Sequence, residues 1–235
     1  MLGQLAGDAL GGLVEFRSAA TIHREHPKGV GLLYDGGHWN TLGGQPTDDS
    51  EMALVLARSI VNHGAYDTEA AARAYAWWYG SHPYDIGSTT SAAVSAAAAA
   101  VSAGRSAAVA ATSAALQESQ ANGALMRVSP LGILGGGARQ GDAGEWARQD
   151  ALLTHPNAVC QHANMVYAEA LAFAVRTGSG PEETYGFAIE TAKRILKADG
   201  VGASCSPECI LAVAPLGKPG GWHRQNGDGR GRHRH

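Results

Sequence analysis

Thr47, Asp48 and Asp49 are the strongest candidates for chemistry in this sequence. Two adjacent carboxylates and a hydroxyl follow a long glycine-rich segment, and they stand where a helix is expected to begin. Oxygen donors of this kind are the ligands that a hard divalent cation such as Mg²⁺ or Mn²⁺ prefers. Helix capping is the alternative interpretation, because Asp48 and Glu51 have the spacing of a capping box and acids favour the positive end of a helix dipole.

Two later segments carry weaker signals. Asn-Gly at 122–123 is typical of a turn, but Arg127 and a Ser-Pro pair follow within a few residues. This combination is compatible with a loop that presents backbone N–H groups to a phosphate or a ribose. In the stretch 154–156, His155 is either a surface residue at a helix entry or a residue at a cleft edge. In the second case it would donate to a substrate hydroxyl or stack on a ring.

The elements that must position these residues are predicted to be helices. Apolar residues recur at helical spacing in several segments, no stretch alternates with period two, and glycine or proline punctuates the boundaries. The helix after Pro83 is expected to be capped by Ser88 or Thr89, and prolines fit the first turn of the last two helices. The predicted helices cover residues 1–16, 47–64, 67–79, 88–116 with a break at Gly104, 144–153, 156–177 and 181–198, and residues 17–46 are predicted to be a long loop.

Composition supports an all-α domain over residues 1–198 and an irregular tail over 199–235. Of the 235 residues, 45% are hydrophobic and only 6% are aromatic. Small side chains suit close-packed helices better than a β-sandwich. The tail is rich in glycine, arginine and histidine, so it is expected to be disordered. Residues 122–130 are expected to be irregular as well.

Charge and cysteine content exclude several classes of protein. The net charge of −3 gives no reason to expect nucleic acid or an anionic membrane as a partner. We expect neither a signal peptide nor a membrane-spanning helix. Three cysteines do not indicate a disulfide framework, so a cytoplasmic location is expected.

Five motifs occur in a fixed order along residues 1–198. They are Gly7-Asp8-Ala9-Leu10-Gly11, Thr47-Asp48-Asp49-Ser50-Glu51-Met52, Asp85-Ile86-Gly87-Ser88-Thr89-Thr90, Asn122-Gly123-Ala124-Leu125-Met126-Arg127-Val128-Ser129-Pro130 and Thr154-His155-Pro156. In this order they resemble the ADP-ribosylglycohydrolase family, which includes the enzyme that reactivates dinitrogenase reductase. The resemblance implies a single-domain orthogonal helical bundle with a binuclear Mg²⁺ or Mn²⁺ centre. It also implies hydrolysis of the N- or O-glycosidic bond between ADP-ribose and a protein side chain or small molecule.

The resemblance also implies roles for individual residues. The first set of metal ligands would be Thr47, Asp48 and Asp49, and the two aspartates would thereby take part in catalysis. Glu15 would act as a base or position the water that attacks the anomeric carbon. The residues expected to line the ADP-ribose cleft are Gly87, Asn122, Gly123 and His155.

The sequence departs from the family pattern in its C-terminal third. The second metal half-site is an Asp-Thr-Asp-Thr type of motif, and residues 156–235 do not contain one. Asp199 and Asp228 each lack a neighbouring threonine and a second acid two positions away. Two alternatives to an active hydrolase therefore stay open. One is a truncated, catalytically defective member that binds ADP-ribose-like ligands without turnover, and the other is a zinc-binding module on Cys205, Cys209, His223 and His233 or His235.

Overall fold

The computed structural model describes residues 1–198. The regular structure in this range is helical, apart from one isolated antiparallel bridge between Gly36 and Thr41, so the all-α prediction is confirmed. The predicted tail, 199–235, lies outside the described residues. The elements are α1 (Leu2–Gly11), α2 (Ala19–Glu25), α3 (Asp48–His63), α4 (Thr68–Tyr79), α5 (Ser88–Ser102), α6 (Ala107–Ala114), the short 3-10 helix η1 (Leu125–Arg127), α7 (Ser129–Gly135), α8 (Asp142–Leu152), α9 (Ala158–Thr177) and α10 (Pro181–Ala198).

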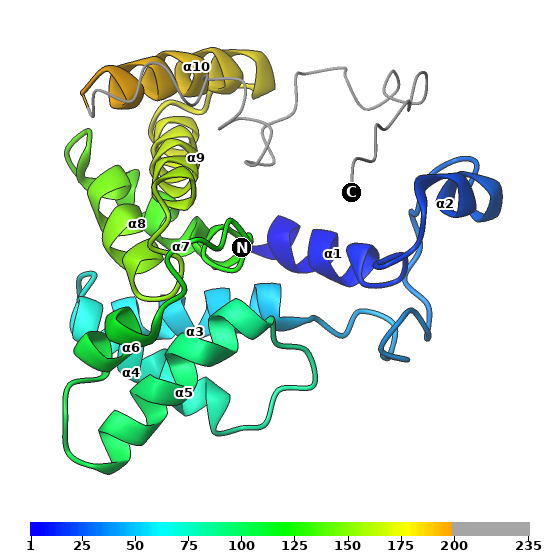
Figure 1. Ribbon diagram of the computed structural model, residues 1–235. Coiled ribbons are helices and arrows are strands. Elements are labelled where there is room, and N and C mark those ends of the chain that lie inside the picture. Colours follow the sequence, from blue (N-terminus) through cyan, green and yellow to red (C-terminus); the bar gives the residue numbers. More distant parts are fainter. Residues whose placement is uncertain (199–235) are drawn as a thin grey trace, which may run out of the picture.

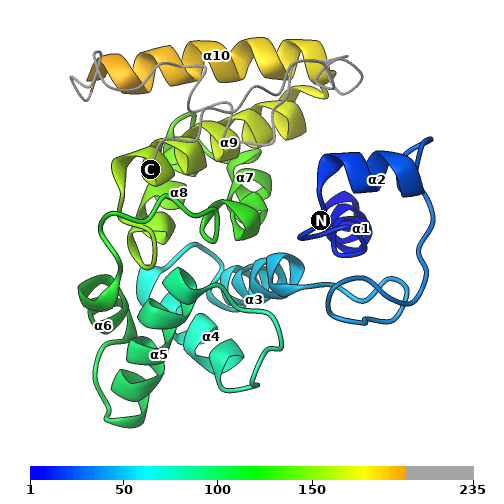
Figure 2. The ribbon, with the colours of Figure 1, turned by 45° about the vertical axis from the view of Figure 1, so that its right-hand side comes forward.

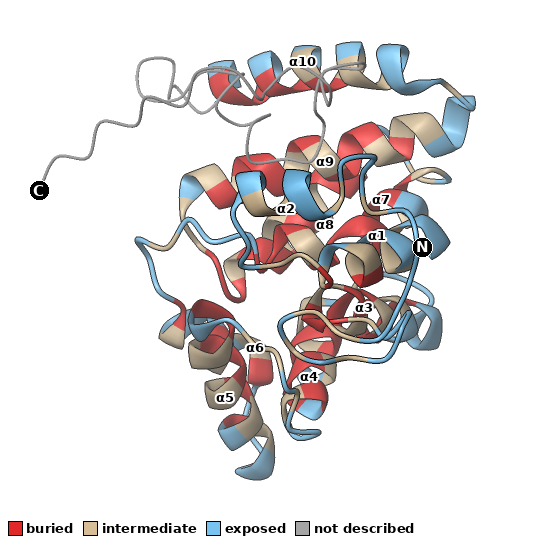
Figure 3. Ribbon diagram, turned by 90° about the vertical axis from the view of Figure 1, so that its right-hand side faces the viewer, coloured by how far each residue is buried: buried red, intermediate tan, exposed pale blue. Residues whose placement is uncertain are grey.

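The helices form two groups. In the first, α4 packs against α3, α5 and α6, and in the second α9 packs against α7, α8 and α10. Contacts of α3 with η1 and α7 join the two groups. Helix α1 lies beside the start of α3, and α2 lies beyond the end of α1 at the edge of the molecule (Figure 1). Figure 2 shows α1 and α2 together on one side of the other helices. None of the residues of α2 is buried, and it is coloured mostly as exposed in Figure 3.

The strongly periodic helices have the predicted bounds. Helix α3 ends at Gly64, whose φ of 72° is the left-handed conformation that glycine adopts easily. Asp67 caps α4 by accepting a hydrogen bond from Ala70 N at 2.7 Å. Both boundaries follow from local chemistry, and the sequence displays that chemistry directly.

Other boundaries differ from the prediction. The first helix ends at Gly11 instead of near residue 16, and α2 occupies part of the expected loop, where Ser18 accepts a hydrogen bond from Thr21 N. Residues 122–130 were expected to be irregular, but η1 and the start of α7 form there. Pro181 opens α10 as predicted, whereas α9 begins only after Asn157, which caps it.

Small residues allow the helices of the core to approach closely. Helix α5 buries Ala93, Ala97 and Ala100 completely, together with Val94. Each alanine contributes little apolar area, so the stabilisation comes from dense packing across many short side chains. The second group has its own apolar cluster between α9 and α10, which includes Val166. Figure 3 shows the buried surfaces turned toward the helix interfaces.

Three helices are capped at their N-termini by a carboxylate from a different helix. Asp8 of α1 caps α3. Glu69 of α4 accepts hydrogen bonds from the first turn of α6, including Ala108 N at 2.9 Å. Glu169 of α9 accepts one from Gly144 N of α8 at 2.8 Å. These contacts satisfy N–H groups that a helix leaves unpaired at its start, and they also fix how the helices are arranged.

Candidate active site

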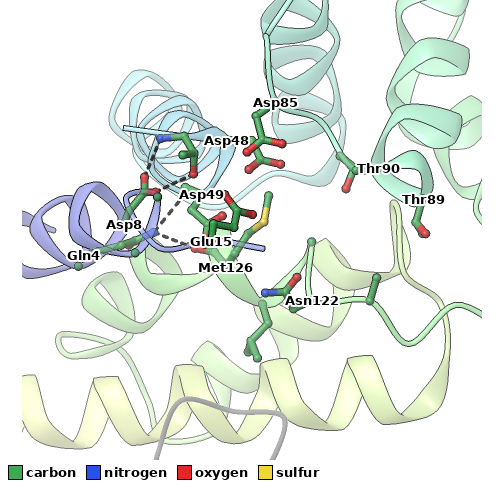
Figure 4. A pocket seen from close by; sticks show the side chains of 18 of the residues that line it. Gln4, Asp8, Glu15, Asp48, Asp49, Asp85, Thr89, Thr90, Asn122 and Met126 are labelled. Carbon is green, nitrogen blue, oxygen red and sulfur yellow. Dashed lines mark hydrogen bonds between the residues drawn. The ribbon is translucent and has the colours of Figure 1, made fainter. Parts of the chain in front are cut away.

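A pocket of about 780 Å³ lies where the ends of α1, α3 and α5 meet the segment before η1. Carboxylates gather on one side of it, while Asn122 and Thr90 lie on the other (Figure 4). Every one of the predicted site residues lines this pocket. They are Glu15, Thr47, Asp48, Asp49, Gly87, Asn122, Gly123 and His155.

Asp8 determines what the acids at the start of α3 can do. Its carboxylate accepts hydrogen bonds from Thr47 N at 3.0 Å, Thr47 Oγ1 at 2.6 Å and Ser50 N at 3.1 Å. Because Asp8 supplies the cap, the interpretation of Asp48 and Glu51 as a capping box is wrong. Neither makes a side-chain cap, and Glu51 instead accepts a hydrogen bond from Trp78 Nε1 at 2.8 Å.

Asp48 and Asp49 therefore line the pocket and do not cap the helix, Asp48 being buried and Asp49 partly buried. Burial raises the pKa of both carboxyls, and nearby acids raise it further: Asp85 is the largest of these for Asp48, and Asp8 for Asp49. Among the lining residues within 1–198 there is neither lysine nor arginine. The negative charge on this side of the pocket is therefore not balanced by a lining lysine or arginine, and only a smaller attraction by His38 acts on Glu15 and Asp85.

Glu15 and Asp85 complete the acidic side from two other segments. Glu15 follows α1, and its pKa is raised by burial and by the charge of Asp85. Asp85 comes from the loop before α5, and burial also raises its pKa. Sequence reasoning missed Asp85 and Asp8 as site residues, although both belong to motifs that it had singled out. The available signal was a carboxylate within two residues of a glycine in each motif.

The opposite wall is built from a close contact between Gly123 and His155. A Cβ atom on Gly123 would lie 2.8 Å from His155 Cε1 and 2.5 Å from Thr90 Oγ1, so only glycine fits. His155 is fully buried, and the surface-histidine interpretation is therefore wrong.

The predicted cap of α5 is also wrong. The residue before this helix is Gly87, not Ser88 or Thr89, and it provides no side-chain cap.

His155 presents one nitrogen that has no partner among the described residues. Its Nδ1 lies 2.8 Å from Thr154 Oγ1, while its buried Nε2 makes no hydrogen bond within 1–198. Burial, assisted by the charge of Arg127, lowers the pKa of His155 to about 3. The imidazole is consequently neutral at physiological pH.

Arg127 supports this wall from behind and is absent from the pocket lining. It is completely buried and donates to Asp150 Oδ2 at 2.9 Å, to the Asp150 carbonyl at 3.0 Å and to the Gly123 carbonyl at 3.2 Å. The Tyr75 ring lies under the guanidinium, with its centroid 4.3 Å from Arg127 Cζ, and the Tyr75 hydroxyl donates to Asp150 Oδ1 at 2.8 Å. The arginine thus holds the Asn122–Gly123 turn in place and is not available to a phosphate.

The donor set at the start of α3 fits a hard divalent cation by its chemistry. Thr47, Asp48 and Asp49 offer only oxygen, and the excess negative charge around them favours a cation. Within residues 1–198, no three His, Cys, Asp or Glu side chains are already grouped as a metal site. The alternative zinc ligands and both C-terminal aspartates considered above lie outside the described range.

Comparison with known proteins identifies the family. The family model described as ADP-ribosylglycohydrolase matches residues 1–222. The chain belongs to the ADP-ribosylglycohydrolase family. It is 34% identical over 157 residues to ADP-ribosyl-[dinitrogen reductase] glycohydrolase of Rhodospirillum rubrum, which covers 66% of this chain and 49% of that protein. It is also 35% identical over 101 residues to ADP-ribosylarginine hydrolase Tri1 of Pseudomonas putida, covering 40% of this chain and 26% of that protein.

The fold agrees with this assignment. A solved structure titled ADP-ribosylglycohydrolase-related protein complex matches with a TM-score of 0.67 and 27% identity, over 90% of this chain and 63% of that one. The chain spans half or less of the length of these two curated relatives. Of the helices in residues 1–198, none has the length and apolar character needed to cross a membrane.

Proposed function

We propose that the chain hydrolyses the glycosidic bond between ADP-ribose and an amino-acid side chain, with arginine as the linked residue. One observation carries the proposal: the two sides of the pocket suit the two ends of such a substrate. Its acidic side, which includes Glu15, Asp48, Asp49 and Asp85, suits a divalent cation together with the reacting carbon and the nitrogen bound to it. The neutral wall at Gly123 and His155 suits the ADP-ribose. Two relatives, an ADP-ribosyl-[dinitrogen reductase] glycohydrolase and an ADP-ribosylarginine hydrolase, support the same substrate class by their names.

Residues at the start of α3 would hold Mg²⁺ or Mn²⁺. Thr47, Asp48 and Asp49 would be its ligands, and the metal would serve to orient the ribose hydroxyls and the attacking water. The hydroxyl of Thr47 donates its proton to Asp8, so the lone pairs of Thr47 Oγ1 stay available to other partners. Asp8 thereby fixes the ligand side chain and the first turn of the helix together.

The acid–base work falls to Glu15 and Asp85. A water oxygen forms a bond to the anomeric carbon, and one of its protons passes to the Glu15 carboxylate. The bond from that carbon to the leaving nitrogen breaks, and the nitrogen takes a proton from the Asp85 carboxyl. Burial raises the pKa of both groups, which keeps an acid protonated closer to neutral pH than an exposed aspartate would be.

His155 and Gly123 would hold the ADP-ribose. When the Thr154 hydroxyl donates to Nδ1, the His155 proton lies on Nε2, where it can bond a phosphate or ribose oxygen. The absence of a side chain at Gly123 lets a ligand approach the backbone of the turn. Arg127 keeps this turn fixed from behind.

The test is release of ADP-ribose from an ADP-ribosylated arginine peptide, with Mg²⁺, with Mn²⁺ and with a chelator. We expect metal-dependent release that falls at least about a hundredfold in Glu15→Gln, as for loss of a general base. Glu190→Gln, on the exposed side of α10, is the matched control and should keep full activity. Calorimetric binding of ADP-ribose without any turnover would refute the proposal and favour the defective, ligand-binding alternative.

A further inference from the structure

Four aromatic side chains form a cluster directly behind the acidic side of the pocket. Phe16 meets His38 at 4.6 Å and Trp39 at 6.3 Å between ring centroids, and Trp39 meets Tyr84 at 5.8 Å. All of these contacts are edge-to-face, the arrangement that aromatic pairs prefer. Phe16 lines the pocket, whereas Trp39 does not, so Trp39 lies behind the residues that line the pocket.

The cluster connects the two segments that carry Glu15 and Asp85. Phe16 is the residue after Glu15, and Tyr84 is the residue before Asp85. Tyr84 also donates to the Pro46 carbonyl at 2.5 Å, which ties its loop to the entry of α3. Trp39 therefore contacts the direct chain neighbour of each carboxylate.

The turn that delivers Trp39 is fixed against the end of α1. Gly36 and Thr41 exchange two backbone hydrogen bonds of 2.9 Å, which close the turn. A Cβ on Gly37 would lie 2.5 Å from the Gly12 carbonyl oxygen, so the turn packs directly on the backbone three residues before Glu15. Displacement of Trp39 would thus require the whole turn to move.

The indole N–H of Trp39 is buried and has no acceptor of full hydrogen-bond geometry among the described residues. It is nevertheless close enough to Glu15 and to Asp85 to lower the pKa of each, against the larger upward effect of burial. The single indole N–H of Trp39 is shared between the carboxylates of Glu15 and Asp85 and makes a complete hydrogen bond with neither. A buried donor is costly unless it has a partner, so this N–H favours having both carboxylates beside it.

Backbone strain gathers in the same three segments. Within residues 1–198, the non-glycine residues with positive φ are Phe16 at 60°, Asn40 at 53° and His82 at 57°. They are the neighbours of Glu15 and Trp39, and a residue of the loop that carries Asp85. Such conformations persist only where the surroundings hold them, and they concentrate at functional sites.

We propose that Trp39 is a positioning residue that holds Glu15 and Asp85 as a pair facing the pocket, through its ring contacts and its indole N–H. Its catalytic consequence rests on the proposed function, but the positioning itself can be tested without turnover. Trp39→Phe keeps an aromatic ring and removes the N–H, whereas Trp39→Leu removes both. Trp77→Phe is the matched control, because Trp77 is 66% exposed on α4 and belongs to no part of this cluster.

The first experiment is an indole ¹H–¹⁵N spectrum at fixed pH, in which Trp39→Phe assigns the Trp39 signal. We expect this signal to move in Glu15→Gln and in Asp85→Asn, and to stay in place in Glu190→Gln. A Trp39 signal that ignores both pocket substitutions would overturn the proposal. This result does not depend on whether the chain is an active hydrolase.

The second experiment separates kcat from KM. For Trp39→Phe we expect kcat to fall about tenfold with KM nearly unchanged, because misplacing catalytic groups affects the chemical step more than binding. Trp39→Leu should lose more, and Trp77→Phe nothing, with all three folded by circular dichroism. Equal loss in kcat and in ADP-ribose affinity would show a merely structural role and contradict the proposal. An inactive wild type would refute the proposed function alone.

Discussion

Asp150→Ala is expected to be one of the most destabilising single substitutions in this protein. Asp150 and Arg127 are both completely buried, and their side chains meet at 2.9 Å. Removing one partner of a buried ion pair leaves the other charge without compensation, at a cost of about 3–5 kcal/mol. A domain usually has only about 5–15 kcal/mol in total. The loss also frees the guanidinium that holds the Gly123 carbonyl, so the Asn122–Gly123 turn should loosen.

Urea unfolding followed by circular dichroism measures this effect. Lys193→Met is the matched control, because it breaks an exposed pair with Glu190 and should cost less than about 1 kcal/mol. Tyr75→Phe removes one hydrogen bond to the Asp150 carboxylate and should fall between the two, at about 1–2 kcal/mol. The double substitution Arg127→Met/Asp150→Leu should recover part of the loss, since no unpaired charge remains.

An Asp150→Ala variant no less stable than Lys193→Met would contradict this prediction. That outcome would mean that Arg127 finds another partner or solvent without disturbing the fold. Hydrogen exchange of the amides at 122–124 provides a second check. If the arginine anchors the turn, amide exchange at 122–124 should accelerate in Asp150→Ala more than amide exchange in α9.

Three further predictions follow from the pocket. Gly123→Ala should abolish calorimetric ADP-ribose binding while leaving most helicity intact, since its Cβ would meet the His155 ring at 2.8 Å; unchanged affinity would contradict the assigned wall. Asp48→Asn/Asp49→Asn should raise the melting temperature of the metal-free protein yet remove its further rise with MgCl₂, because burial and repulsion destabilise these charges; a lower metal-free melting temperature would oppose this. His155 should contribute a loss of stability below about pH 6.5, because its unfolded form binds a proton that the folded form, with a pKa of about 3, does not, at up to about 1.4 kcal/mol per pH unit. Asp48 and Asp49, whose pKa values are raised, contribute in the opposite direction. His155→Gln should therefore gain stability relative to the wild type as the pH falls below about 6.5 in urea titrations, and a stability difference that does not change with pH would contradict the assignment.

Local chemistry explains which elements could be predicted. Helix α3 has a continuous apolar stripe and ends at Gly64, and α4 begins at the capping residue Asp67, so both appear in the sequence. Helix α2 has no buried residue and therefore no apolar stripe to detect. Helix α7 is short and glycine-rich, and it depends on packing against α9 that the sequence does not display.

The predicted site residues line one pocket, but Asp8, Asp85 and the contacts of the site were not predicted. Asp48 and Asp49 stood out because two adjacent acids at the start of a helix suggest either helix caps or metal ligands. Their freedom from capping depends on Asp8, which lies 39 residues before Thr47. The role of Arg127 depends in the same way on Asp150, 23 residues later. In both cases the role of a residue depends on a partner, Asp8 or Asp150, that lies far away in the sequence and comes close only in the folded chain.

The contact from Asp8 explains why the pocket is so acidic. Acids at a helix N-terminus normally gain about 0.3–1 kcal/mol from the helix dipole, and a capping role would satisfy them further. Here Asp8 takes that role, so Asp48 and Asp49 keep only the dipole, and burial with neighbouring charge outweighs it, as their raised pKa values indicate. Such an arrangement is unfavourable for the protein alone and becomes favourable when a cationic ligand binds. The structure thus concentrates its electrostatic cost where the proposed chemistry would relieve it.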